Sequence, residues 1–366
     1  MRVLFHCRPS FTRFAGGDAV QILGTKQALE NLGVQVDIST ETSPNPRGYD
    51  IVHIFNPVLV SMAGASKAQD LGIPVAISTI YWPMYQYFRS YLGLIQEYTE
   101  HKPSGWLGFA VEAFGRYVTY TYLWNTYLGW RLKKFVALAD LLLPNSQAEA
   151  KELAAQFQPR AKIIPVSNGV DLKVNTLAPR ITTGLPKELA SLEDYILCVG
   201  RLELRKNQHL LIQALHNSPQ PLVFVGNMAV STGYTVLCQK LGRKRLGPTY
   251  FIAHLPHELL PGVYERAALH VMPSWYETPG LSSLEAAAAG VPIVTIDQGG
   301  TREYFGPDAT YCPPGDVQLL VEAISEALQK RPNPKLAERI RRDFSWEKAG
   351  AQTLAAYQHI LKTKSR

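Results

Sequence analysis

Short apolar, β-branched segments alternate with helical patterns along almost the whole chain, and this alternation constrains the fold more than any other feature. The strand-like segments include "RVLFHC", "DIVHIF" and "PVAIST" in the first half and "YILCVG", "PLVFVG" and "VPIVTID" in the second. After the first of them, "AVQILGTKQALENLG" places Leu23, Leu29 and Leu32 on one predicted helix face and ends at Gly33. Strands separated by helices form right-handed βαβ units and a parallel sheet, so the sequence predicts an α/β fold.

The alternation pauses once, near residues 172–192, where prolines, a glycine and threonines predict an interdomain linker. With 366 residues, the chain is long enough for two domains with separate cores. We therefore predict two Rossmann-like, doubly wound domains that face each other across a cleft. In such sheets, ligands bind at the carboxyl ends of the strands.

Charge and cysteine content narrow the class of protein. The formal net charge of +7 favours an acidic partner: nucleic acid, an anionic membrane surface or a phosphorylated small molecule. No nucleic-acid-binding module is recognisable, so nucleic acid is the least favoured of the three. The four cysteines form no C-x-x-C pair, which predicts neither a disulfide framework nor a zinc site and fits a reducing cytoplasmic location. The N-terminal "MRVLFHCRPS" predicts a strand and not a signal peptide, and no apolar run is long enough to span a membrane.

Two glutamates, Glu277 and Glu285, lie eight positions apart in "PSWYETPGLSSLEAAAAGVPIVT". The pattern predicts a strand, a tight Pro-Gly connection and a helix, with Gly280, Leu281 and Ser282 at the helix N-terminus. Free backbone N–H groups and the helix dipole favour an anion there. The carboxylates suit hydroxyl groups, so a ligand with a central phosphate and hydroxyls at both ends, such as a nucleotide sugar, fits this pattern. A loop glutamate and an ordinary helix glutamate are the alternative interpretation.

A second polar segment, "VGRLELRKN", follows another predicted strand. The strand ends at Gly200, and Arg201 and Lys206 lie in the loop and at the start of the next helix. Two cations placed after a strand end can hold a diphosphate and neutralise it as a leaving group. Two solvated basic residues are the alternative.

Together these segments resemble the E-x7-E signature and the Arg–Lys block of the family-four retaining glycosyltransferases. The similarity extends to "GGDAVQILGTKQALENLGVQVDI", "DIVHIF", "NGVD" and the closing "FSWEKAGAQTLAAYQHIL". The resemblance implies a GT-B fold, in which residues 1–175 form the acceptor-side domain and residues 176–344 bind the nucleotide sugar. Residues 345–366 would form a terminal helix that returns to the first domain.

The same resemblance implies roles for individual residues. Arg201 and Lys206 would hold the diphosphate, and Glu277 would contact the transferred sugar; these three are the implied catalytic residues. Glu285 would accept hydrogen bonds from the ribose hydroxyls. The other implied donor-binding residues are Gly16, Gly17, Gly200, Gly280, Leu281 and Ser282.

The mechanism implied by the family retains the anomeric configuration, with attack from the face that the nucleotide leaves. A donor phosphate oxygen would take the acceptor's proton. The chain contains no D-x-D triplet, so we expect Arg201 and Lys206 to replace a metal ion and no cofactor to be required. The sequence does not predict whether the donor is linked to UDP, GDP or ADP.

Three positions bear on how far the resemblance extends. Many relatives carry a histidine after the strand "VAIST", where this chain has Tyr81 and Trp82, so the donor sugar is not predicted. His53 matches a family position, although a histidine in a strand is more often a packed residue. His254 lies near the expected base-binding loop, with a contact to the base and no contact equally favoured.

An aromatic insertion, residues 82–134, interrupts the first domain and contains "YVTYTYLWNTYLGWRLKK". Tyr and Trp favour the membrane–water boundary, and flanking Lys and Arg favour anionic headgroups. Three interpretations stay open: a peripheral contact with the inner face of a membrane, internal packing, or self-association. Candidate acceptor or membrane contacts are Tyr81, Trp82, Trp124 and Trp130.

The leading functional hypothesis is a nucleotide-sugar-dependent hexosyltransferase with a saccharide or lipid-linked acceptor, active in polysaccharide or glycolipid synthesis. Two alternatives stay open. A sugar-nucleotide epimerase shares the two-domain architecture, but the chain lacks an evident acid/base carboxylate pair for epimerisation. A non-enzymatic nucleotide-sugar-binding scaffold at a membrane would be expected to have lost some of the donor residues, which are all present here.

Overall fold

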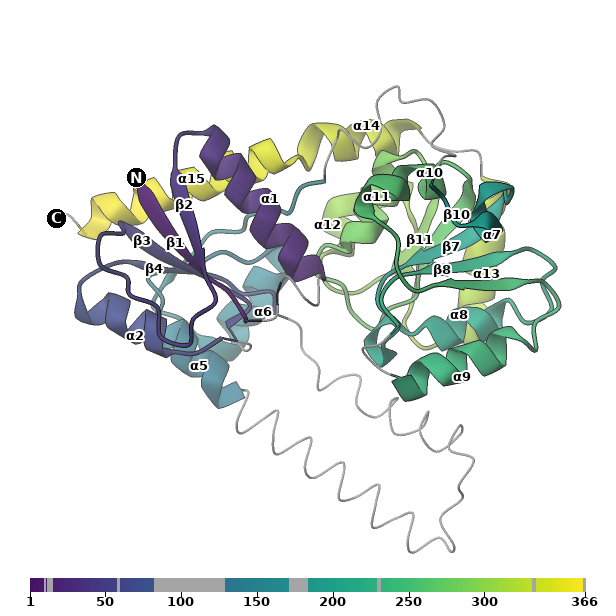
Figure 1. Cartoon of the computed structure of the whole chain (residues 1–366), viewed down its shortest axis with the longest axis horizontal. Coiled ribbons are helices and arrows are strands. Elements are labelled where there is room, and N and C mark those ends of the chain that lie inside the picture. The colour runs from purple at the N-terminus through teal and green to yellow at the C-terminus, as the bar shows by residue number, and fades with distance from the viewer. Residues whose placement is uncertain are drawn as a thin grey trace, which may run out of the picture. The chain divides into compact units, whose positions relative to one another are not determined.

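The structure, a computed structural model, divides the chain into two compact units, each with its own hydrophobic core (Figure 1). The first unit comprises Met1–Gly169 and Trp346–Arg366, and the second comprises Val170–Ser345. The chain thus enters the second unit once and returns to the first with its last helix. The residues that the structure describes are 1–9, 11, 16–57, 60–81, 129–170, 184–228, 232–330 and 334–364.

The first unit is built on a parallel sheet with the strand order β2-β1-β3-β4-β5-β6. Its strands are β1 (Arg2–His6), β2 (Gln35–Ser39), β3 (Ile51–Phe55), β4 (Val75–Ser78), β5 (Leu141–Leu142) and β6 (Lys162–Ile163). Its helices are α1 (Gly17–Asn31), α2 (Ala63–Asp70), α5 (Gly129–Leu138), α6 (Gln147–Phe157) and α15 (Trp346–Lys364). Every residue of β3 and β4 is buried, as in a sheet covered on both faces.

Helix α1 turns a different face to the core from the one that the leucine spacing predicts. Leu29 is fully buried, as expected, but Leu23 and Leu32 are 52% and 46% exposed, so the prediction is wrong at these two positions. The physical reason is α15, which packs on α1. A Cβ at Gly24 would collide with the ring of Trp346, so a small residue at this position lets the two helices approach closely.

A buried histidine links α15 to the sheet. His53 on β3 is 1% exposed, and its Nδ1 lies 2.5 Å from the hydroxyl of Tyr357 on α15. Its Nε2 lies 3.0 Å from Oγ of Ser78 on β4. Burial lowers the pKa of His53 to about 3, so the ring is neutral at physiological pH. His53 is therefore a packed histidine with both ring nitrogens in contact with polar partners.

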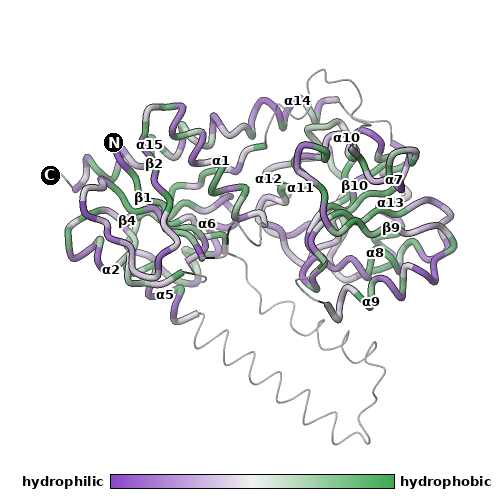
Figure 2. Tube along the Cα trace, viewed as in Figure 1, coloured by the Kyte–Doolittle hydropathy of each residue, from purple (hydrophilic) through white to green (hydrophobic). Residues whose placement is uncertain are grey.

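The second unit contains a second parallel sheet with the strand order β12-β11-β10-β7-β8-β9. Its strands are β7 (Tyr195–Val199), β8 (Leu222–Val225), β9 (Thr249–Ile252), β10 (Ala267–Met272), β11 (Ile293–Ile296) and β12 (Thr310–Cys312). Its α-helices are α7 (Lys187–Ala190), α8 (Gln208–Ala214), α9 (Thr232–Gly242), α10 (Leu260–Tyr264), α11 (Leu281–Ala288), α12 (Thr301–Phe305), α13 (Val317–Gln329) and α14 (Pro334–Asp343), and its 3-10 helices are η5 (Leu204–Lys206), η6 (His257–Leu259) and η7 (Gly306–Asp308). Figure 2 shows that the strands of both units run through largely hydrophobic stretches.

Alternate residues of β7 pack into different cores on the two faces of the second sheet. Tyr195, Leu197 and Val199 belong to one cluster, and Ile196 and Cys198 belong to the other. Helices therefore cover both faces, as the predicted doubly wound fold requires. The predicted α/β class, with one parallel sheet in each half of the chain, is confirmed.

The strand order of the second unit indicates where along the sheet a ligand is expected to bind. The chain builds outward from β7 to β9 and then crosses to β10, which pairs with β7 on the other side. The loops after β7 and β10 therefore leave neighbouring strands at the point where the order reverses. In open α/β sheets this is the position at which ligands bind.

The predicted linker extends too far toward the C-terminus. Residues 184–192 belong to the second unit and include α7, where Leu185 and Leu189 are buried in the core. Leu185, two residues before α7, and Leu189, within it, anchor the segment in this core.

Two further observations concern cysteines and membrane spans. All four cysteines are buried and free. Among the described helices, none is long and apolar enough to cross a membrane.

Candidate functional site

The two polar segments singled out in the sequence follow β7 and β10, the neighbouring strands at the reversal of strand order. The first leaves β7 at Gly200, whose N–H donates to the carbonyl of Val225 at the end of β8. It carries Arg201 and then forms the short helix η5, which ends at Lys206. Asn207 follows with a left-handed backbone (φ +58°), a conformation that asparagine tolerates better than most residues.

The second segment leaves β10 after Met272 and carries Glu277 to the start of α11. Its backbone is held by two neighbouring loops. The N–H of Trp275 donates to the carbonyl of Arg205 at 2.9 Å, and the Glu277 carbonyl accepts from the N–H of Gly300 at 3.1 Å. A Cβ at Gly299 would collide with this carbonyl, and the positive φ of +73° favours glycine there as well.

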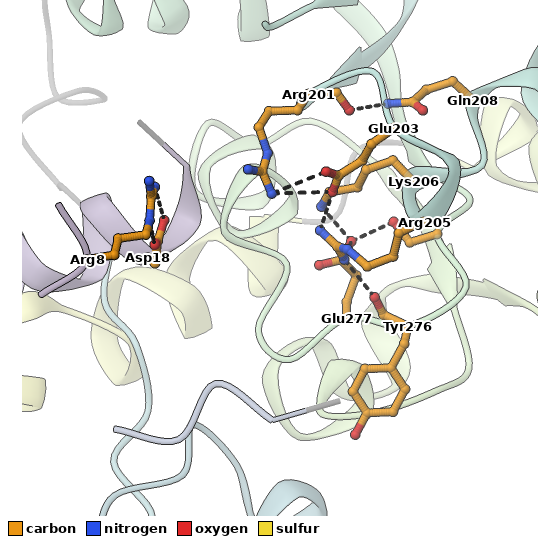
Figure 3. A network of polar contacts seen from close by, with 10 residues as sticks. Arg8, Asp18, Arg201, Glu203, Arg205, Lys206, Gln208, Tyr276 and Glu277 are labelled. Atoms are coloured by element: carbon orange, nitrogen blue, oxygen red, sulfur yellow. Dashed lines mark hydrogen bonds and ion pairs between the residues drawn. The ribbon is translucent and has the colours of Figure 1, made fainter. Parts of the chain in front are cut away.

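Glu277 is the centre of a buried charged cluster (Figure 3). Its Oε1 accepts from Lys206 Nζ at 2.6 Å and from Ser274 Oγ at 2.5 Å, and Arg205 Nη1 lies 3.4 Å away. Arg205 also donates to the carbonyl of Tyr276 at 3.0 Å. Lys206 and Glu277 thus form a direct ion pair. The family resemblance assigns them to different parts of a donor, the diphosphate and the transferred sugar.

The protonation states of this pair follow from burial and charge. Burial acts to raise the pKa of Glu277, but the charges of Lys206 and Arg205 and the hydrogen bonds from Lys206 and Ser274 outweigh it and lower the pKa to about 2. Burial lowers the pKa of Lys206, and the charge of Glu277 acts against that shift. Glu277 is therefore ionised at neutral pH and can only accept hydrogen bonds.

The cluster continues through Glu203. This carboxylate bridges two guanidinium groups: Arg205 Nη2 lies 2.9 Å from its Oε1, and Arg201 Nη2 lies 3.3 Å from its Oε2. Burial acts to raise the pKa of Glu203, but the charges of Arg205 and Arg201 outweigh it and lower the pKa. Figure 3 shows these side chains pointing toward one another from the loop after β7. With Lys206 and Glu277, the cluster contains three cations and two carboxylates, so one positive charge remains.

The N-terminus of α11 lies directly after Glu277 in the chain. Gly280 is its N-cap, with φ +70°, and its carbonyl accepts from the amides of Ser283 and Leu284. The amides of Leu281 and Ser282 belong to the first helical turn, where the helix itself offers no acceptor. These amides and the helix dipole favour an anion, as the sequence predicts.

Glu285, one turn further along α11, makes its contacts with other side chains than Glu277 does. Its Oε2 accepts from the hydroxyl of Tyr264 at 2.8 Å, and its Oε1 lies 3.4 Å from Nε2 of His257. Tyr264 ends α10 and is fully buried, whereas the His257 side chain is about half exposed. The two glutamates of the motif therefore lie in different surroundings, one held by cations and the other by a neutral hydroxyl.

The predicted glycine pair belongs to the first unit. Gly16 caps α1 with an extended backbone (φ −145°), and Gly17 is the exposed first residue of that helix. The next residue, Asp18, forms a two-pronged ion pair with the buried Arg8, at 2.5 Å and 3.1 Å. The backbone angles of Gly16 do not themselves require glycine, so any such requirement would have to come from a close neighbour.

The structure sorts the remaining sequence candidates into core and surface. Tyr81, a predicted acceptor or membrane contact, is 4% exposed and donates its hydroxyl to Gln156, so its ring packs in the core of the first unit. Trp130 is 48% exposed on α5. His254 is exposed in the loop after β9. Trp82 and Trp124, with most of residues 82–134, lie outside the described residues.

Sequence reasoning missed several members of the site. Glu203 and Arg205 lie inside the segment "VGRLELRKN". The closely spaced acidic and basic residues of this segment could have indicated an internal ion-pair network. Ser274 and Tyr264 carry no local signal, because their roles depend on contacts made in the folded unit. Within the described residues, no three His, Cys, Asp or Glu side chains are grouped so as to hold a metal ion.

Comparisons with known proteins agree with this arrangement. The family described as "Glycosyl transferases group 1" matches residues 186–343, and "Glycosyltransferase Family 4" matches residues 45–174. The two matches together cover most of the chain. A glycogen synthase of Mycobacterium tuberculosis is 32% identical over 231 residues, which are 60% of this chain and 54% of that protein. The chain spans about half the length of curated relatives such as this one.

Solved structures share the fold over the full length. Sucrose-phosphate synthase from Thermosynechococcus elongatus has a TM-score of 0.73 and 19% identity, covering 99% of this chain and 100% of its own. HepE (Alr3699) of Anabaena in complex with UDP has a TM-score of 0.65 and 19% identity, covering 100% of both chains. At such identity these similarities bear on the fold, and they support the predicted GT-B class.

Proposed function

The chain belongs to the family 4 glycosyltransferases, and from this premise we propose that it transfers a sugar from a nucleotide-sugar donor to a saccharide or lipid-linked acceptor. A relative that is a glycogen synthase supports a role in polysaccharide synthesis, and a structural neighbour bound to UDP supports a nucleotide-sugar donor. The matched families are those of transferases, so they give no support to the epimerase or scaffold alternatives.

The single observation that carries the proposal is the Lys206–Glu277 ion pair at the reversal of strand order, with Arg205 and Arg201 beside it. The donor's diphosphate carries two negative charges, and the cluster has one positive charge in excess next to the first turn of α11. Cations and helix amides that are already fixed in place stabilise a developing phosphate charge without reorganisation. In this proposal Arg201 and Lys206 hold the diphosphate, and the amides of Leu281 and Ser282 assist them.

In this proposal Glu277 accepts hydrogen bonds and does not donate a proton. With a pKa of about 2 it stays ionised, so it suits the hydroxyls of the transferred sugar as an acceptor and cannot act as a general acid. We therefore propose that the bond between the anomeric carbon and the diphosphate oxygen breaks while the acceptor oxygen bonds to the same face of that carbon. The acceptor's proton passes to the departing phosphate oxygen, and the configuration is retained. A hexose is the expected cargo, as in the family that the sequence resembles.

The proposal needs no resident metal ion, because Lys206, Arg201 and Arg205 supply the positive charge that the leaving group requires. Glu285 lies further along α11 and accepts from the ribose hydroxyls of the donor. Gly16 and Gly17 of the first unit are proposed to bring backbone close to the donor phosphates.

The decisive experiment is thermal stabilisation of the full chain by UDP, GDP, ADP and their common sugar conjugates. Ligand at 100 times its dissociation constant stabilises the native state by about 2.7 kcal/mol, enough for a clear shift in Tm. We expect one base to give the shift and Lys206→Met, which keeps the side-chain length but removes the charge, to weaken binding by about 10- to 100-fold.

Lys330→Met is the matched control, because Lys330 is an exposed residue directly after α13, where its Nζ pairs with Glu326 and lies 3.5 Å from the hydroxyl of Thr310. It should bind nucleotide as the unmodified chain does. If no nucleotide shifts Tm, the transferase proposal fails. If Lys206→Met binds with full affinity, Lys206 is removed from the donor site. Retention is read separately, from the anomeric coupling constant of the first product by proton NMR.

A further inference from the structure

Tyr264 is a buried tyrosine whose hydroxyl contacts Glu285, the second glutamate of the motif. It is the last residue of α10 and is fully buried in the core of the second unit. Its hydroxyl donates to Oε2 of Glu285 at 2.8 Å. Burial and the charge of Glu285 raise the pKa of Tyr264 well above 10, so the hydroxyl keeps its proton and remains a donor at any physiological pH.

The contact fixes one side of a carboxylate and leaves the other side accessible. Glu285 is half-buried, and its second oxygen, Oε1, has His257 Nε2 at 3.4 Å, the long end of the hydrogen-bonding range. The His257 side chain is 47% exposed, so a ligand could displace this weak contact. A carboxylate held through one oxygen by a rigid, buried ring has a defined plane, which fixes where Oε1 points.

The chemistry of the fixing group also matters. Glu277 is held by cations, which offset its charge, whereas the hydroxyl of Tyr264 that holds Glu285 is neutral. Hydrogen bonds to an ionised acceptor are stronger than those between neutral groups. Glu285 is thus prepared to bind a neutral ligand group with hydroxyl donors.

We propose that Tyr264 is a positioning residue that orients the Glu285 carboxylate toward the ribose hydroxyls of the donor nucleotide. The inference rests on the proposed function, because it takes Glu285 as the ribose acceptor. It adds a buried residue that touches no substrate and acts on donor affinity through Glu285 alone.

Tyr195 provides a closely matched control. It is also fully buried, on β7, and belongs to the same core cluster as Tyr264. Its hydroxyl donates to the carbonyl of Val263, the residue before Tyr264, at 2.6 Å. Tyr195→Phe therefore removes a buried tyrosine hydroxyl from the same region, and both substitutions keep the ring that fills the core.

The test uses the full chain and the nucleoside diphosphate identified from the UDP, GDP and ADP panel, together with its 2′,3′-dideoxy counterpart. Dissociation constants are measured by calorimetry for the unmodified chain, Tyr264→Phe and Tyr195→Phe, and KM and kcat are measured for the sugar donor. Tyr264→Phe should weaken ribonucleotide binding and raise the donor KM by about tenfold, with kcat and dideoxynucleotide binding unchanged, the loss expected for one hydrogen bond to a charged group. Tyr195→Phe should leave all four quantities unchanged.

Glu285→Ala tests whether Tyr264 acts through Glu285. It should weaken ribonucleotide binding by itself, and adding Tyr264→Phe to it should change nothing further, because the tyrosine would have lost the group through which it acts.

The outcomes separate this inference from the proposed function. If Tyr264→Phe leaves ribonucleotide affinity unchanged, or weakens ribo- and dideoxynucleotides equally, the positioning role is wrong. If the unmodified chain binds both nucleotides equally well, Glu285 does not contact the ribose, and the inference fails while the transferase proposal stands. If the chain binds no nucleotide at all, the proposed function itself fails.

Discussion

At the scale of single residues, the two glutamates of one motif show what a sequence can and cannot give. The spacing of Glu277 and Glu285 indicates a loop and the following helix, and both residues lie there. Their partners were not predictable. Lys206 is 71 positions from Glu277, and their 2.6 Å contact exists only because β7 and β10 are neighbours in the sheet. A motif read along the chain therefore finds the carboxylates but not the charges that set their state.

The state of Glu277 predicts an acid-sensitive contribution to stability. Its pKa is about 2 in the folded chain, against an ordinary value of 4.5. A lowered pKa stabilises the folded state above pH 4.5, and this contribution is lost as the pH falls toward 2. In urea denaturation, the advantage of the unmodified chain over Glu277→Gln should shrink by about 2 kcal/mol between pH 7 and pH 3.

The control for this measurement is Glu326→Gln, which removes an exposed carboxylate on α13 from its pair with Lys330. Its difference from the unmodified chain should change little with pH, since exposed ion pairs contribute little. A Glu277→Gln difference that stays constant from pH 7 to pH 3 would show that the carboxylate titrates normally in the folded chain.

At the scale of elements, helix positions are predicted better than helix faces. The leucine spacing places a helix where α1 lies, but Leu23 within it and Leu32 directly after it are exposed, because α15 takes the adjoining face. The residue that permits this contact, Gly24, faces Trp346, which lies more than 300 positions later. Local periodicity cannot report a partner that arrives from the other end of the chain.

At the same scale, we predict that helix α5 contacts a membrane. It buries Leu132, Phe135 and Val136, and its opposite side presents Trp130, with Nζ of Lys134 5.6 Å from the ring centroid. An exposed tryptophan beside lysines suits the interface of an anionic membrane. We expect the full chain to cosediment with vesicles containing anionic lipid, and Trp130→Ala to reduce the bound fraction by several-fold.

The vesicle experiment has two controls, a substitution at another exposed apolar residue and a change in salt concentration. Leu246 is 71% exposed in the second unit, so Leu246→Ala removes an exposed apolar side chain elsewhere and should leave vesicle binding unchanged. Binding should also fall with rising salt, because charges near a surface are screened. Equal cosedimentation of Trp130→Ala and the unmodified chain would exclude Trp130 as a membrane contact.

At the scale of the whole molecule, the alternation of strands and helices predicts two α/β halves, whereas the division of the chain between them is implied only by the family resemblance. The alternation of strands and helices is local, so both parallel sheets could be predicted. Strand order is not local, and it decides that the loops after β7 and β10 meet. The path of the chain is not local either: the backbone N–H of Val170 donates to the carbonyl of Phe344 at 2.9 Å, which holds the two ends of the second unit together.

This closure predicts that the second unit is an independent nucleotide-binding module. Residues Val170–Ser345 contain both core clusters of their sheet and all four of Arg201, Lys206, Glu277 and Glu285. Expressed alone, this segment should melt cooperatively and bind the same nucleoside diphosphate as the full chain, within about tenfold in affinity, but should not transfer sugar. Circular dichroism and calorimetry measure both properties, and the same segment with Lys206→Met controls for non-specific binding. A segment that melts cooperatively yet does not bind a nucleotide that the full chain binds would place an essential part of donor recognition in the first unit, with Gly16 and Gly17 the first residues to test. Binding that matches the full chain would instead confine the first unit's contribution to the acceptor and the transfer step.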